Sequence, residues 1–342
     1  MSEFSRRHFG KMAVCALAAA GAAPLAAATR VPIPGRVSTR PGAPSADFLR
    51  LAVTTWSFHM PLMRGQLKAV DVPGLVKSLG IDTVEWTSKV FRDLSGGPEL
   101  MFQAPSAQFF RDVRKASDAA GVDNRVVNVG GPYFLAGAEK ATRDKAVDWT
   151  LQYVEPAQIL GAKIMRTELY CDLPEGPGRA RRATDLAMEG LHALLDRTKD
   201  SGLIINVENH HGISAQPEWL AGLIRAMNHP RLGLTVDTNN NRVDDSNPYA
   251  LDPKKLPHYI DRYRGLEILM PFANWISAKT YTFDSAGYEI ALEYPRILSI
   301  ILKSGYAGPL SIEYEGNLEP VEGVRRSITM FRMLKEHLSE LP

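Results

Sequence analysis

From residue 49 onward, short β-branched apolar runs alternate with longer stretches of helical periodicity. This alternation is typical of parallel βα units, in which a helix returns the chain to the same edge of a sheet. The pattern predicts eight strands, at 50–58, 83–87, 125–130, 162–168, 203–210, 232–239, 275–283 and 310–315. It also predicts amphipathic helices between them, among others at 106–120, 142–160, 183–201, 289–304 and 319–338.

A glycine follows five of the predicted helices, and a glycine just past a helix readily takes the left-handed conformation that ends it. The first four stand 40 or 41 residues apart, which indicates one repeated unit; the five are Gly80, Gly121, Gly161, Gly202 and Gly305. Eight such units close a barrel, so we predict a single (β/α)₈ TIM barrel over residues 49–342. An open doubly wound sheet shares the alternation. It usually has a glycine-rich phosphate loop after its first strand, where this chain continues with residues 55–59, TWSFH.

The first 28 residues differ from the rest. Arg6 and Arg7 precede an apolar run at 12–23 and a small-residue segment ending at Ala28. This order predicts a removable export signal, and the run is too short for a stable membrane anchor. The paired arginines followed by Phe9 resemble a twin-arginine signal, which implies export of the folded protein by the twin-arginine machinery to the periplasm or beyond the cell. An ordinary secretory signal is the alternative.

Residues 29–48 are rich in Pro, Gly, Ser and Thr and are predicted to form a flexible leader. The chain has two cysteines, and removal of the signal would leave only Cys171, so an intramolecular disulfide is excluded. Such a chain suits folding in the cytoplasm before export.

The composition adds two constraints. Hydrophobic residues make up 45% of the 342 residues and charged residues 23%, which is enough to bury a substantial core. The formal net charge is +2 and the basic residues are dispersed, so nothing indicates a surface that binds nucleic acid.

Three acidic residues stand at the ends of predicted strands: Glu208 after strand five, Asp237 after strand six and Glu313 after strand eight. In a closed barrel these ends meet at one face, so the three carboxylates are predicted to surround a common volume. Carboxylates crowded in a low-dielectric site need a cation or protons between them. We therefore predict a divalent metal there, Mn²⁺ first, with Mg²⁺, Co²⁺ and Zn²⁺ as alternatives. Lys279 on strand seven is predicted to pair with the acidic cluster or to contact substrate.

Four short motifs resemble those of the xylose-isomerase-like barrel superfamily, the sugar phosphate isomerase/epimerase group. They are residues 207–210 (VENH), 235–239 (TVDTN), 277–279 (SAK) and 311–316 (SIEYEG). The resemblance extends over essentially all eight strands and is specific as an ordered set. It implies metal ligands at Glu208, Asp237 and Glu313. The family's fourth ligand, a His on strand seven, aligns with Ser277, so His210, His211 or water is left to complete the site.

The same resemblance implies that Glu208 and Glu313 shuttle a proton through a metal-stabilised enediolate, which requires a base and a Lewis acid beside a carbonyl. Further residues at strand ends are predicted to contact a sugar: Trp56, His59, Glu85, Trp86, Asn128, Arg166, Glu168, His210 and His211. The long segment 240–274 is predicted to be a lid over the site or a surface insertion.

The sequence thus favours a metal-dependent sugar isomerase or epimerase. Export favours an unphosphorylated sugar, because sugar phosphates are scarce outside the cytoplasm. A lyase or hydrolase of 3-keto-glycosides would use the same base and metal, and a sugar-binding barrel without catalysis is the third alternative. The endonuclease branch of the superfamily is disfavoured, because the strand-seven His and a basic groove are absent.

Overall fold

The computed structural model describes residues 49–91, 103–131, 134–243 and 259–337. The predicted signal at 1–28 and leader at 29–48 lie outside these ranges. Within them, eight strands follow one another in the predicted order: β1 (Leu51–Thr54), β2 (Thr83–Thr87), β3 (Asp123–Val129), β4 (Ile164–Thr167), β5 (Ile204–Glu208), β6 (Leu232–Asp237), β7 (Ala273–Thr280) and β8 (Leu310–Tyr314).

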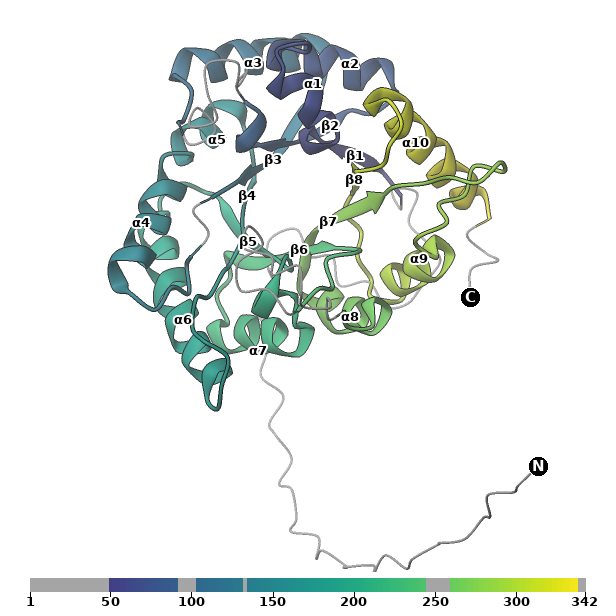
Figure 1. Ribbon diagram of the computed structural model, residues 1–342. Helices are drawn as coiled ribbons and strands as arrows, with labels where there is room; N and C mark the ends of the chain where they lie inside the picture. The colour runs from purple at the N-terminus through teal and green to yellow at the C-terminus, as the bar shows by residue number, and fades with distance from the viewer. Residues whose placement is uncertain (1–48, 92–102, 132–133, 244–258, 338–342) are drawn as a thin grey trace, which may run out of the picture. The chain divides into compact units, whose positions relative to one another are not determined.

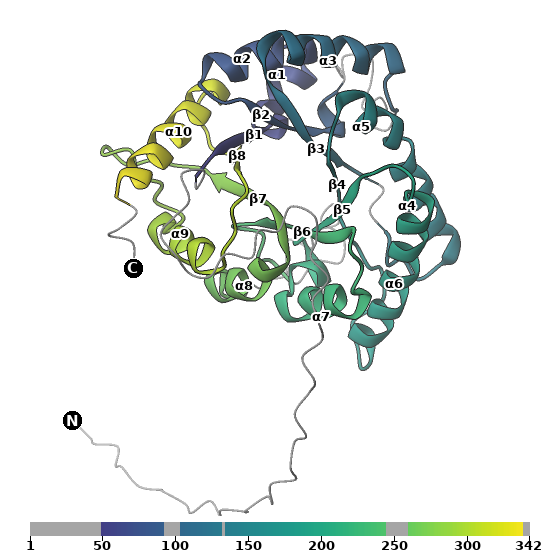
Figure 2. The ribbon, with the colours of Figure 1, turned by 180° about the vertical axis from the view of Figure 1, so that it is seen from behind.

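The strands form one closed sheet. Each pairs in parallel with the next, and β1 pairs with β8, so the order around the ring is the order along the chain. Figure 1 shows this ring surrounded by helices, and Figure 2 shows the same arrangement from behind. The predicted (β/α)₈ TIM barrel is confirmed.

Ten α-helices are described: α1 (His59–Met63), α2 (Val72–Ser78), α3 (Ala107–Ala120), α4 (Lys140–Leu151), α5 (Val154–Leu160), α6 (Arg179–Arg197), α7 (Pro217–Met227), α8 (Arg262–Leu269), α9 (Tyr294–Lys303) and α10 (Pro320–Glu336). All five glycines predicted to follow helices have positive φ, between 64° and 80°. None of these helices combines the length and apolar character that crossing a membrane requires.

One predicted helix is divided. The periodicity at 142–160 predicted a single helix, whereas the structure has α4 and α5 with a break at Gln152 and Tyr153. Pro156 explains the break, because a proline lacks the N–H that would bond to the carbonyl of residue 152 and its ring clashes with that carbonyl.

Alternation along the strands separates two environments, since successive side chains point to opposite faces of a sheet. Outward side chains such as Val53, Val127 and Val236 belong to the main core between sheet and helices. Inside the barrel, a smaller cluster unites side chains from four strands: Ala52, Val126, Ile164 and Trp275. The next inward positions are polar but fully or almost fully buried, among them Glu85, Arg166, Asn206, Thr235 and Ser311. The barrel interior therefore changes from apolar to polar towards the carboxyl ends of the strands.

Helix α6 approaches the chain after β3 closely at Gly190. A Cβ at this position would lie 2.1 Å from the carbonyl oxygen of Leu135, which is backbone and cannot rotate away. We expect Gly190→Ala to destabilise the fold by about 1–3 kcal/mol. Gly222→Ala in α7 is the matched control: no atom lies within 4 Å of its Cβ, so a gain of about 0.5–1 kcal/mol is expected. Urea unfolding of both variants measures the difference, and equal effects would contradict this packing.

Candidate functional site

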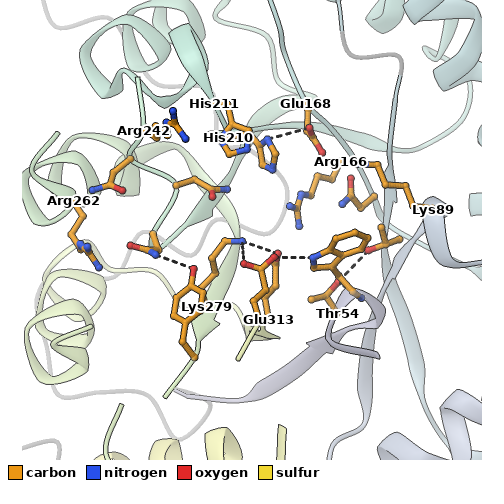
Figure 3. Close-up of a pocket in the computed structure, with 18 of the residues that line it drawn as sticks. Thr54, Lys89, Arg166, Glu168, His210, His211, Arg242, Arg262, Lys279 and Glu313 are labelled. Atoms are coloured by element: carbon orange, nitrogen blue, oxygen red, sulfur yellow. Dashed lines mark hydrogen bonds and ion pairs between the residues drawn. The ribbon is translucent and has the colours of Figure 1, made fainter. Parts of the chain in front are cut away.

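A cavity of about 650 Å³ opens at the carboxyl ends of the strands, and we call it the mouth cavity. All eight strands, or the segments that follow them, contribute to its lining (Figure 3). Most of these side chains are polar: Thr54, Trp56, Thr87, Lys89, Asn128, Arg166, Glu168, His210, His211, Asn239, Asn240, Asn241, Arg242, Tyr259, Arg262, Lys279, Tyr281, Glu313 and Glu315. This is the face where TIM barrels carry their active sites.

On the β7–β8 side, an ammonium group lies among carboxylates. Lys279 Nζ is 3.0 Å from Glu313 Oε1, 2.9 Å from Glu315 Oε2 and 3.8 Å from Asp237 Oδ2. The hydroxyl of Ser277 donates to the other oxygen of Glu313. Burial alone would raise the pKa of Glu313, but Lys279, Arg166 and the Ser277 hydroxyl together lower it to about 2. Glu313 is therefore ionised at neutral pH.

On the β4–β5 side, the guanidinium of Arg166 bridges two fully buried carboxylates. It donates to Glu85 Oε1 and, at 3.0 Å from Nε, to Glu208 Oε2. Glu85 Oε2 accepts two further bonds of 2.8 Å, from Trp275 Nε1 and the Ser311 hydroxyl. Burial raises the pKa of Glu208 well above its usual value, with Arg166 acting against that shift. One guanidinium thus serves two carboxylates, and Glu208 has a greater tendency to hold a proton than Glu313.

Beside Arg166, three side chains form a second polar group at the cavity surface. Tyr170 lies with its hydroxyl 2.9 Å from Glu168 Oε2 and 2.6 Å from His210 Nδ1. Burial, together with His211 and nearby cations, lowers the pKa of His210 well below its usual value. The imidazole is therefore neutral at pH 7 and has the protonation state of a metal ligand.

Asp237 is held by the chain that follows it. Its Oδ1 accepts the backbone N–H groups of Asn239 and Asn240, each at 2.8 Å, whereas its buried Oδ2 has no hydrogen-bond partner. Burial raises the pKa of Asp237 from 3.8 to about 7, although Lys279 acts against it. The folded protein therefore favours the protonated form more than the unfolded chain does.

This shift predicts a pH-dependent effect of Asp237→Asn. Between pH 4 and 7 the folded wild type holds a proton that the unfolded chain releases, so it loses stability as the pH rises, on the order of 3 kcal/mol across the window. The Asn variant lacks this titration, so its unfolding free energy should improve relative to wild type from pH 5 to pH 8. Urea titrations at both pH values measure it. Parallel pH curves would contradict the raised pKa.

Hydrogen-bonding capacity remains unused around the mouth cavity. Three cavity-lining side chains have a buried polar atom without a hydrogen-bond partner among the described residues: Asn128 Oδ1, His211 Nδ1 and Asn239 Oδ1. Buried polar atoms are normally paired, so each of these atoms requires an explanation. A ligand with several hydroxyl groups would supply the missing partners only if neighbouring side chains moved, because these atoms have almost no exposed surface.

The predicted substrate contacts divide into two groups. Trp56, Asn128, Arg166, Glu168, His210, His211 and Lys279 line the cavity. Glu85 and Trp86 do not, and strand alternation is the reason: Glu85 points into the barrel beneath the cavity, and Trp86 points outward, where its Nε1 donates to Asn124. His59 stacks on Trp56 at 4.5 Å between ring centroids but is not part of the lining. For these three residues, substrate contact is not supported.

Several lining residues went unnoticed in the sequence. Thr54 and Thr87 are strand residues in phase with inward neighbours, and their hydroxyls lie 3.3 Å apart. Asn240 donates from Nδ2 to Glu208 Oε1 at 3.1 Å and thereby covers that carboxyl. The centre of the predicted lid at 240–274 lies outside the described residues, but its described ends line the cavity: Asn240, Asn241, Arg242, Tyr259 and Arg262. Tyr281 and Lys89 likewise follow strand ends, and that position alone is a weak sequence signal that a residue lines the cavity.

The comparison with known families bears on this geometry. A family model described as xylose isomerase-like TIM barrel matches residues 73–334. The chain belongs to this family. A search among curated proteins gave no sequence match.

Solved structures of sugar epimerases share the family fold. L-ribulose 3-epimerase superposes with a TM-score of 0.63 at 13% identity, over 86% of this chain and 98% of its own. For 3-keto-D-glucoside 4-epimerase from E. coli the TM-score is 0.60 at 12% identity, over 83% and 99%. For a D-allulose 3-epimerase from Methylomonas sp. in complex with D-allulose it is 0.54 at 12%, over 77% and 83%. At these identities the similarity establishes the fold.

Within this family fold, one group of side chains has the geometry to hold a divalent ion. Ligand atoms of Glu168, Glu208 and His210 all lie within 4.8 Å of one another. The chemistry of two carboxylates and a neutral imidazole suits Mn²⁺, Co²⁺ or Zn²⁺. Of the three carboxylate ligands predicted from the sequence, only Glu208 is in this group, whereas Asp237 and Glu313 lie on the side of Lys279. His210, one of the alternatives predicted for the fourth ligand, is also in the group, and Glu168 was predicted as a substrate contact.

Proposed function

We propose that this protein is an isomerase or epimerase that moves a proton next to the carbonyl of a small sugar, through an enediolate. The observation that carries the proposal is the mouth cavity itself, which is polar, has unused hydrogen-bonding atoms and holds carboxylates on opposite sides. The family fold and its epimerase neighbours support the same class of reaction.

In this proposal Glu313 is the base. It lines the cavity and is ionised at neutral pH, so it can accept a proton from a carbon that faces β8. The bonds from Lys279 and Ser277 that lower its pKa also make it a weaker base, so proton transfer requires these bonds to loosen. Glu208, the second proton-exchanging group, holds its proton more tightly. Because Arg166 and Asn240 bond both its oxygens, substrate contact requires the Asn240 amide to move aside. When the pKa values of two carboxyl groups are shifted apart, the ionised group can accept a proton and the protonated group can donate one.

A divalent ion, Mn²⁺ first, is part of the proposal. Glu168, Glu208 and His210 would hold it, and it would supply a Lewis acid for the substrate carbonyl. Because Arg166 and Asn240 bond the two oxygens of Glu208, the ion would have to share or displace one of these contacts. Tyr170, bonded to both Glu168 and His210, would keep these two side chains oriented.

The substrate we propose is an unphosphorylated sugar or a 3-keto-glycoside. We also propose that the protein is exported in its folded state by the twin-arginine route. The export signal predicted from the sequence supports an unphosphorylated sugar, and the structural similarity to a 3-keto-D-glucoside 4-epimerase supports a 3-keto-glycoside. Elimination from a 3-keto-glycoside is the second candidate, since it begins with removal of the same kind of proton.

A substrate screen tests the proposal. Mature protein is incubated with free ketoses and with 3-keto-glycosides, after chelation and again with added Mn²⁺, and products are separated by chromatography. Formation of a C3 or C4 epimer or an isomeric aldose supports isomerase chemistry. Release of the aglycone identifies the lyase or hydrolase instead. Saturable sugar binding without any product would leave a sugar-binding barrel and refute the enzyme.

A further inference from the structure

Lys279 lies where the sequence predicted a metal. Its ammonium contacts the carboxylates of Glu313 and Glu315 (Figure 3). It lies 3.8 Å from a third carboxylate, that of Asp237, and the Lys279 side chain is only 7% exposed. Two of these three carboxylates, those of Asp237 and Glu313, were predicted ligands. The strand register explains the position, because Lys279 is directly opposite Glu313 on the neighbouring strand and Ser277 is opposite Asp237.

The carboxylate oxygens on this side are already used. Glu313 Oε1 accepts from Lys279 and its Oε2 from Ser277, while Asp237 Oδ1 accepts two backbone N–H groups. Asp237 Oδ2 is the remaining oxygen, and it faces the ammonium. A divalent ion shared by Asp237 and Glu313 would have to displace Ser277 or Lys279. It would also meet the positive charge of Lys279 a few ångströms away in a buried site, where water screens the repulsion between the two cations only weakly.

We propose that the Lys279 ammonium is the resident cation between Asp237 and Glu313 and occupies the position that the sequence assigned to a divalent ion. An ion bound by Glu168, Glu208 and His210 would then be independent of Asp237. The ammonium has three donors, and hydrogen bonds to Glu313 and Glu315 use two of them. Asp237 Oδ2 lies 3.8 Å from Nζ, beyond hydrogen-bond distance, so the Asp237 contact is electrostatic and does not use the third donor. Because Lys279 lines the mouth cavity, a substrate oxygen could accept from this donor.

Mn²⁺ binding, measured by equilibrium dialysis with electron paramagnetic resonance, tests the first statement without any substrate. In the wild-type background, Asp237→Asn should change the Mn²⁺ dissociation constant by less than about threefold. Lys279→Met should create or strengthen Mn²⁺ binding by at least tenfold, because the buried carboxylates lose their cation. In the Lys279→Met background, Asp237→Asn should abolish that gain.

Lys279→Arg is the matched control, since it keeps the positive charge and should give no gain. If Lys279→Met fails to fold by circular dichroism, Lys279→Gln removes the charge with a polar side chain in its place. Two results would overturn the proposal: a tenfold loss of wild-type Mn²⁺ affinity on Asp237→Asn, or no gain when the ammonium is removed.

The role towards substrate rests on the proposed function and has its own measurement. With the substrate found in the screen, Lys279→Met should lower kcat/KM at least about 100-fold, and Lys279→Arg should recover part of that loss. Equal activity of Lys279→Met and wild type would refute this role while leaving the Mn²⁺ result intact. If none of the sugars in the screen is a substrate, the proposed function is refuted. The Mn²⁺ measurements would still decide the position of the cation.

Discussion

Glu313→Gln is expected to slow incorporation of solvent deuterium into a turned-over sugar by about 10²- to 10⁴-fold. The amide has nearly the shape of the carboxylate but cannot accept the proton. Glu208→Gln should cause a loss of similar size, since it removes the second proton-exchanging group. Mass spectrometry of the sugar after turnover in D₂O measures the rate for each variant.

Two further variants make this test specific. Glu155→Gln replaces an exposed glutamate of α5 and should leave the exchange unchanged. Glu168→Gln removes a proposed ligand of the divalent ion, so its loss should be partly recovered at a higher Mn²⁺ concentration, unlike the loss in Glu313→Gln. Full exchange in both Glu208→Gln and Glu313→Gln would rule out the two-glutamate mechanism.

The second large effect concerns stability. Arg166→Met should lower the free energy of unfolding by about 3–5 kcal/mol, because it leaves two carboxylates buried without their shared cation. These are Glu85 and Glu208, both with no exposed surface. The loss should shrink at pH 4, because burial raises the pKa of Glu208 and a protonated Glu208 does not require a cation. Urea unfolding at pH 7 and pH 4 measures both parts.

Arg197→Met is the control for this prediction. Arg197 pairs with Asp148 on the surface, where the two side chains are 52% and 59% exposed. Exposed pairs contribute about 0–1 kcal/mol, so a small loss at most is expected. If Arg166→Met cost no more than Arg197→Met, the bridge between Glu85 and Glu208 would not stabilise the barrel.

The sequence predicted the fold well because its signals are local. Alternating strands and helices, and glycines such as Gly121 and Gly161 just past helix ends, depend on residues close together in the chain. The location of the site was also predictable, since the ends of parallel strands meet at one face of a closed barrel. Seven of the ten predicted substrate contacts accordingly line the mouth cavity, among them Lys279 on one side and Arg166 and Glu168 on the other. Glu313, predicted as a proton-exchanging group, lines it beside Lys279.

The partners of each charged group were not predictable in the same way. Which carboxylates Arg166 and Lys279 contact depends on register between strands that are 34 to 81 residues apart. The resemblance of short motifs predicts the family's metal ligands at Asp237 and Glu313. It does not reveal that the Lys279 ammonium lies between these two side chains. Trp86 shows the same limit, because a shift of one residue along a strand turns a side chain from the interior to the outer face.

Proton NMR in D₂O tests most directly whether the protein exchanges the proton on the carbon next to a sugar carbonyl. Wild-type protein with added Mn²⁺ is incubated with free ketoses and 3-keto-glycosides, and the proton signal next to each carbonyl is followed. For at least one sugar we expect this signal to disappear faster than in the protein-free control, together with formation of an epimer or isomer. Retention of every such signal, in every sugar and with metal present, would contradict it.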